Sequence, residues 1–162
     1  MSARSVSDIL LDGVVAVLLA ATLILSFVQV VARYIFLLST PWSEELARLF
    51  FVWGVFLGAA VGVKRNLHTR VDFIFQRLSA RASAWLLAGM DLLVAGMAVV
   101  MIAHGSQLIY STRTDFSTSL GYPRNLFYVP VPISGLLMLW YLIPGMIRRL
   151  AGRTPAAPAE KG

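Results

Sequence analysis

Few side chains in this sequence could do chemistry. Only 14% of the 162 residues are charged and cysteine is absent, which excludes disulfides, thiol catalysis and cysteine-based metal sites. His68 lies in a basic loop and His104 in a long apolar segment, so the two are poorly placed to hold one haem between them. No serine stands in a recognisable catalytic motif, and no phosphate-binding glycine loop occurs. We therefore expect no enzyme and no cofactor or metal on this chain.

Asp91 is the acidic residue that lies in the longest apolar stretch of the sequence. It is the single Asp, Glu, Lys or Arg in the 31 residues from Ala82 to Thr112, and an acid within a membrane helix is a candidate proton relay. The segment is longer than a span needs, however, so it can slide until Asp91 reaches the edge of the bilayer. We favour the boundary position with a structural role, and the relay stays an alternative.

Glu44, Glu45 and Arg48 precede an apolar segment that is too short to span a membrane alone. Leu49–Val63 gives 15 uncharged residues, about 22 Å of helix, whereas the hydrocarbon core is ~30 Å thick. A spanning helix must therefore begin near Trp42 and bring these charges to the membrane boundary, where they usually face protein or water. Glu44 and Arg48 are one turn apart and can pair. A coupling-ion site would need converging oxygens that the segment does not show.

Four apolar segments hold these residues, each close to the ~20 residues that cross a bilayer as helix. With 58% hydrophobic residues, the sequence predicts an all-α integral membrane protein with one domain, 1–150. Between the second and third spans, basic residues alternate with apolar ones in a pattern typical of an interfacial amphipathic helix. The predicted elements are transmembrane helices at 9–36, 42–63, 83–112 and 126–147, an interfacial helix at 65–80, and a disordered cytoplasmic tail at 151–162.

The distribution of Lys and Arg predicts the orientation. Ten of the 14 lie at the two termini or in the loop 64–81, so the positive-inside rule places both termini and this loop in the cytoplasm. The net charge of +6 therefore does not indicate nucleic-acid binding. We expect the loop cations to lie on lipid headgroups: Lys64, Arg65, Arg70, Arg77 and Arg81. Arg33 is a further boundary charge, and Trp42 and Trp85 are predicted interface anchors.

Small residues recur at helical spacing on the second and third spans. Gly54, Gly58 and Gly62 form a doubled small-xxx-small pattern, which lets a neighbouring backbone approach closely. Geometry places Glu44 and Arg48 beside this face and Glu45 on the opposite side. On the third span the small residues, seven apart, are Gly89, Gly96 and Ala103. Both sets are interpreted as packing faces, either for a partner protein or within the bundle.

Several short stretches, in order, resemble one known family, the DctQ-type small permease of tripartite ATP-independent periplasmic (TRAP) transporters. The resemblance extends from about Val31 to Met138. The stretches are Val31–Phe36, Trp42–Arg48, Phe51–Ala60, His68 with Val71-Asp72, Ser119–Pro123 and Tyr128–Ile133.

The resemblance implies a scaffold subunit in the bacterial inner membrane, without a solute site of its own. Its partners would be a large permease that carries substrate and sodium, and a periplasmic binding protein that delivers an organic acid. On the outer face, Arg113, Asp115 and Arg124 are candidates for contact with the binding protein. Two hypotheses from other classes stay open: a stand-alone proton-coupled exporter that uses Asp91, and a haem-bearing membrane anchor.

Overall fold

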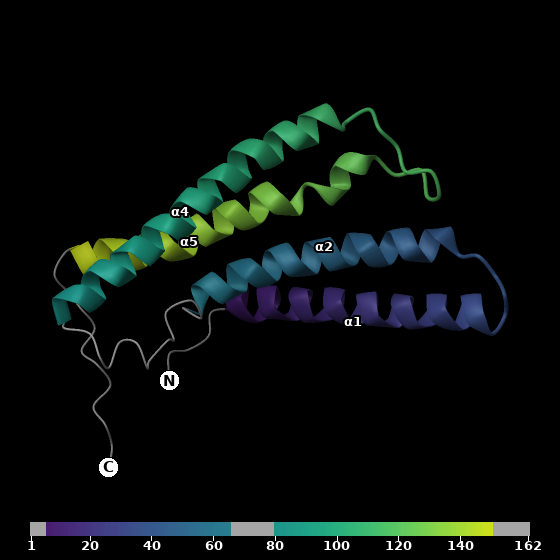
Figure 1. Ribbon diagram of the computed structural model, residues 1–162, viewed down its shortest axis with the longest axis horizontal. Coiled ribbons are helices and arrows are strands. Elements are labelled where there is room, and N and C mark those ends of the chain that lie inside the picture. The colour runs from purple at the N-terminus through teal and green to yellow at the C-terminus, as the bar shows by residue number, and fades with distance from the viewer. Residues whose placement is uncertain (1–5, 66–79, 151–162) are drawn as a thin grey trace, which may run out of the picture.

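The computed structural model describes residues 6–65 and 80–150, and these residues form a helical bundle (Figure 1). The elements are α1 (Val6–Tyr34), α2 (Pro41–Lys64), α4 (Ala80–Ser111), the 3-10 helix η2 (Arg124–Phe127) and α5 (Pro130–Leu150). Within the described ranges, four helical stretches are long and apolar enough to cross a membrane. The predicted all-α membrane fold is thus confirmed, whereas the orientation stays a prediction. The tail 151–162 and nearly all of the predicted interfacial helix lie outside the described residues.

The first three helices begin and end within three residues of the predicted spans, and the fourth differs most. A helix was predicted from residue 126, but the chain first makes η2 and begins α5 at Pro130. Proline has no amide hydrogen and fits the first turn of a helix, where that donor has no partner. Pro130 and Pro132 therefore start α5, and the amide of Tyr128 closes η2 by donating to the carbonyl of Asn125 at 2.8 Å.

The helices pair as two antiparallel hairpins (Figure 1). α1 lies along α2, α4 lies along α5, and α2 also packs on α5, so that it joins the hairpins. The connecting segments 35–40 and 112–123 lie at one end of the bundle, here called the outer end. The inner end contains the start of α1, the end of α2, the start of α4 and the end of α5.

The α1–α2 connection turns on a left-handed residue. Leu37 has a φ of 54°, a left-handed conformation common just after the end of a helix, and the amide of Leu38 donates to the carbonyl of Ala32 at 2.9 Å. For a residue with a side chain this conformation costs roughly 1–2 kcal/mol. Pro41 then occupies the first position of α2. The short turn brings α2 back alongside α1.

The apolar core lies where α2, α4 and α5 meet. Its buried residues are Ala60, Val63, Ala98, Met101 and Met138. Two glycines let α4 and α5 approach closely. A Cβ on Gly135 would lie 2.8 Å from the carbonyl oxygen of Ala98, and one on Gly105 would lie 2.8 Å from Cδ of Pro132. This second hairpin is therefore tightly packed.

Candidate interaction surfaces

The glycines of α2 lie mainly toward α1. A Cβ on Gly54 would lie 3.1 Å from Cδ2 of Leu19, and one on Gly58 would lie 3.6 Å from Cγ1 of Val15, whereas nothing approaches Gly62 within 4 Å. Two of the three glycines thus contact another helix of the same chain.

The small residues that the sequence pattern predicts to form a packing face on α4 lie on an exposed face of the helix. Gly89, Gly96 and Ala103 are exposed, and no atom lies within 4 Å of a Cβ built on either glycine. The close approach of α4 to α5 uses Gly105 and Gly135 instead, which the sequence reasoning missed. Neither glycine belongs to a repeat in the sequence, so neither stood out as part of a packing face. The adjacent small residues Ser134 and Gly135 were an available indication.

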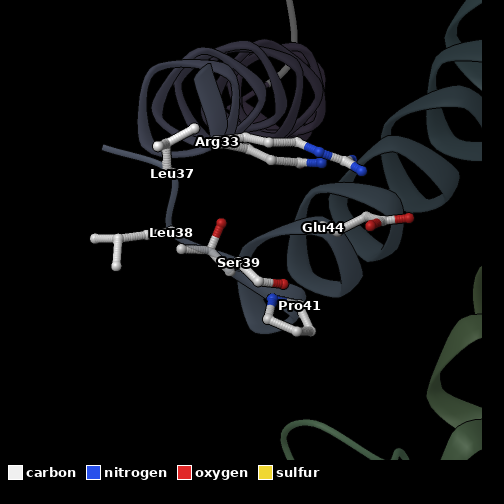
Figure 2. A pocket seen from close by; sticks show the side chains of 8 residues that line it. Arg33, Leu37, Leu38, Ser39, Pro41 and Glu44 are labelled. Atoms are coloured by element: carbon white, nitrogen blue, oxygen red, sulfur yellow. The ribbon is translucent and has the colours of Figure 1, made fainter. Parts of the chain in front are cut away.

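Glu44 and Arg48 form an ion pair, with Nη2 of Arg48 2.8 Å from Oε1 of Glu44. Both side chains are more than half exposed, at 53% and 65%, so the pair is accessible to a partner. Glu44 also lines a cleft of about 340 Å³ at the outer end. Figure 2 shows Arg33 of α1 and Glu44 of α2 flanking this cleft, beside the connecting residues Leu37–Ser39. Arg33 has no ion-pair partner within the described part of the chain.

Glu45 lies apart from this pair, beside Tyr122 of the segment 112–123. Oε2 of Glu45 and the hydroxyl of Tyr122 are both inaccessible to solvent. Within the described residues, neither atom makes a hydrogen bond of standard geometry. Burial raises the pKa of Tyr122, and the negative charge of Glu45 raises it further, while Arg124 and Arg48 act in the opposite direction. A carboxylate of α2 is therefore held against the loop that precedes α5.

The outer loop brings together the three residues predicted to meet a binding protein. The guanidinium of Arg113 lies 4.1 Å from the ring centroid of Tyr110, and the amide of Arg124 donates to the carbonyl of Asp115 at 2.8 Å. All of Arg113, Asp115 and Arg124 are exposed.

The loop is fixed at its base. Phe116 and Pro123 form an antiparallel bridge, and the amide of Ser117 donates to the carbonyl of Tyr122 at 2.8 Å. Below them, the indole N–H of Trp53 donates to the carbonyl of Leu126 at 3.0 Å. A hydrogen bond from α2 thus anchors η2, and with it the charged loop, to the first hairpin.

At the inner end, the two basic residues that close α2 contact other helices. Arg65 forms an ion pair with Asp12 of α1 at 2.6 Å, and Nζ of Lys64 lies 5.3 Å from the ring centroid of Tyr141. Asp12 was missed as a partner, although it is an acid at the edge of the first apolar segment. Of the other residues predicted to contact lipid headgroups, Arg70 and Arg77 lie outside the described residues, as does the side chain of Arg81.

The remaining candidates are spread along the bundle. Asp91 is buried in α4, while Trp85 near the inner end and Trp42 at the outer end are 79% and 45% exposed, as suits residues in contact with an interface. Within residues 6–65 and 80–150, no group of three or more His, Asp or Glu side chains could hold a metal ion.

Comparison with known proteins gives a consistent result. The family model for the DctQ component of tripartite ATP-independent periplasmic transporters matches residues 22–152. A TRAP transporter small permease of Haemophilus influenzae is 30% identical over 80% of this chain and 81% of its own. The small permease SiaQ of a sialic acid TRAP transporter from Vibrio cholerae is 28% identical over 76% of this chain and 71% of its own. The isethionate TRAP permease DctMQ of Oleidesulfovibrio alaskensis is 30% identical over 76% of this chain, which is 21% of that longer protein.

The chain belongs to the DctQ family of TRAP transporter components. The family resemblance noted in the sequence is therefore confirmed. This DctQ-family chain is a multi-pass membrane protein and a transporter component, not an enzyme. Two of its family-like stretches, Trp42–Arg48 and Ser119–Pro123, are distant in sequence but meet at the outer end, where Glu45 lies beside Tyr122.

Proposed function

We propose that this chain is the scaffold subunit of a sodium-coupled importer of an organic acid. It supports a large permease subunit in the bacterial inner membrane and helps to dock a periplasmic binding protein. The names of its relatives favour an organic anion as the solute: they include permeases for sialic acid, isethionate and C4-dicarboxylates. All three solutes carry a carboxylate or sulfonate group.

The observation that carries this proposal is the continuity of the spans. Secondary transporters bind solute and ions at membrane helices that are broken near the midplane. Here α1, α2 and α4 run without interruption, and the proline inside α5, Pro144, lies toward its inner end. The core cluster between α2, α4 and α5 is apolar, and the hydroxyl of the buried Ser134 donates to the carbonyl of Pro130 within its own helix. We therefore assign the solute and sodium sites to the large permease.

The outer end is the proposed docking surface. With the predicted orientation it faces the periplasm, and it presents Arg113, Asp115 and Arg124 on a loop that Trp53 anchors. Exposed charge pairs contribute about 0–1 kcal/mol each. Reversing all three charges should therefore slow uptake without abolishing it.

Reconstitution tests the proposal. The chain, its large permease and its binding protein would be combined in proteoliposomes with a sodium gradient, and uptake of labelled sialic acid, isethionate and succinate would be measured. We expect uptake of an anion only when all three proteins are present, and none from vesicles that contain this chain alone. Transport by the chain alone that disappears in Asp91→Asn would contradict the scaffold role and favour the exporter.

A further inference from the structure

A groove of about 610 Å³ runs along the outer half of the first hairpin, between α1 and α2. α1 contributes Thr22, Ser26 and Gln29 to its wall, and α2 contributes Glu44, Arg48 and Phe51. Leu19, Leu23 and Ala47 complete the lining, so the groove is mainly apolar but carries polar side chains from two helices that span a membrane.

Polar residues on α1 recur along the groove and continue into the outer-end cleft, which Arg33 lines. Thr22, Ser26, Gln29 and Arg33 are spaced by four, three and four residues, so they share one face of the helix. Elsewhere on α1, large apolar side chains such as Ile24 and Phe27 are exposed, as expected of a surface that contacts lipid. Polar side chains in a membrane helix usually face protein or water instead.

Several hydrogen-bond donors and acceptors on this face have no partner within the described residues. The Thr22 hydroxyl donates to the carbonyl of Leu18 at 2.8 Å. Within residues 6–65 and 80–150, by contrast, the side chains of Ser26 and Gln29 make no hydrogen bond and Arg33 makes no ion pair. A primary amide has two donor hydrogens and an acceptor oxygen, and leaving such a group unpaired in hydrocarbon is costly.

The depth of these residues in the bilayer indicates which kind of molecule can form hydrogen bonds with them. The span of α1 covers Ile9–Tyr34, so Thr22 lies near its midpoint. Gln29 is seven residues further on, about 10 Å at 1.5 Å per residue, and hence within the ~15 Å half-thickness of the hydrocarbon core. Acyl chains offer no hydrogen bond at this depth. A neighbouring transmembrane helix does, through Ser, Thr, Asn or Gln side chains.

We propose that this groove seats a transmembrane helix of the large permease subunit. That helix presents a polar side chain opposite Ser26 and Gln29, and an acidic group near its outer end for Arg33. The charges agree with this choice, because Glu44 is already paired with Arg48 and the cation of Arg33 is left for the partner. The inference rests on the proposed function and adds to it the face through which the small subunit binds the large one.

Site-specific photo-cross-linking in the intact complex tests the position of the permease. Ser26→p-benzoylphenylalanine places the probe in the groove, and Ile24→p-benzoylphenylalanine places it on the exposed far side at nearly the same depth. We expect an adduct with the large permease, identified by mass spectrometry, from position 26 and none from position 24. A permease adduct from position 24 alone would overturn the proposal, as would a lipid adduct or a dimer of this chain from position 26.

A second measurement tests the amide itself. Interhelical hydrogen bonds in membranes average about 0.6 kcal/mol, so Gln29→Leu should lower the amount of co-purified permease about threefold. Gln29→Asn, which keeps the amide, should restore part of the binding. Val28→Leu, outside the groove, should leave it unchanged. Equal binding by Gln29→Leu and Val28→Leu would contradict the inference. Failure of the unaltered chain to co-purify with a permease would instead contradict the proposed function.

Discussion

The two hairpins of this protein are of similar length, but their helices contact one another in different ways. The α4–α5 hairpin is tight, because Gly105 and Gly135 each bring a backbone within contact of the opposite helix. In the α1–α2 hairpin, Gly54 and Gly58 meet only side chains of α1, and toward the outer end a groove with polar side chains in its lining lies between the two helices.

Burial also differs between the two helices of the first hairpin. None of the most apolar stretch of α1 is buried, whereas 39% of that of α2 is. α2 is covered by α1 on one side and by α5 on the other, while α1 packs mainly against α2. A helix that carries polar side chains on an open face, as α1 does, is suited to a partner outside the chain. Of the four candidate spans α1 is therefore the least covered by the described chain, since 11% of the corresponding stretch of α4 and 22% of that of the fourth span are buried.

The largest effect is expected at the tight contact. In Gly135→Ala the new Cβ would meet the Ala98 carbonyl at 2.8 Å, and the two helices must separate, at about 1–3 kcal/mol as for other overpacked sites. Gly96→Ala is the matched control on α4, with no atom within 4 Å. Unfolding of the purified chain in mixed detergent would measure both. Equal stability of the two variants would show that the α4–α5 contact is not tight.

The link between the hairpins should have a smaller effect. Trp53→Phe removes the indole hydrogen bond to Leu126, and a hydrogen bond contributes about 1 kcal/mol. We expect faster amide exchange in residues 124–129 with little change inside α4. Hydrogen–deuterium exchange with mass spectrometry would detect it. Unchanged exchange there would mean that the outer loop is held by other contacts.

The inner ion pair should contribute still less. Asp12→Asn breaks the 2.6 Å pair with Arg65, whose side chain is 51% exposed, and partly exposed pairs contribute about 0–1 kcal/mol. The double variant Asp12→Arg with Arg65→Asp should recover most of the loss. The same unfolding assay measures this, and a loss above about 2 kcal/mol would exceed what a surface pair contributes.

The smallest effect concerns Tyr122 and is confined to high pH. Because the pKa of Tyr122 is raised in the folded protein, the folded state keeps its proton when the unfolded state has lost it. Stability should therefore be independent of this group below its ordinary pKa of 10.0 and fall as pH rises above that value. Glu45→Gln should shift the phenolate absorbance titration of Tyr122 toward lower pH. A titration that Glu45→Gln leaves unchanged would contradict the contact.

Much of the fold could be predicted because its causes act along the chain. Apolar length requires four spans, and the ion pair of Glu44 with Arg48 follows from their separation by one helical turn. The prolines of the fourth span were also visible, but the 3-10 turn before Pro130 was not expected, because its hydrogen bonds depend on how the preceding loop is folded.

Contacts between helices could not be predicted in the same way. Pairs such as Asp12 with Arg65, and Glu45 beside Tyr122, join residues that are 53 and 77 positions apart. Likewise, repetition in the sequence singled out Gly89 and Gly96, whereas the contact between α4 and α5 is made at Gly105 and Gly135. Periodicity states which residues share a face, but not which neighbour that face meets. Helix rotation and axial offset, set by the fit of side chains between helices, decide that.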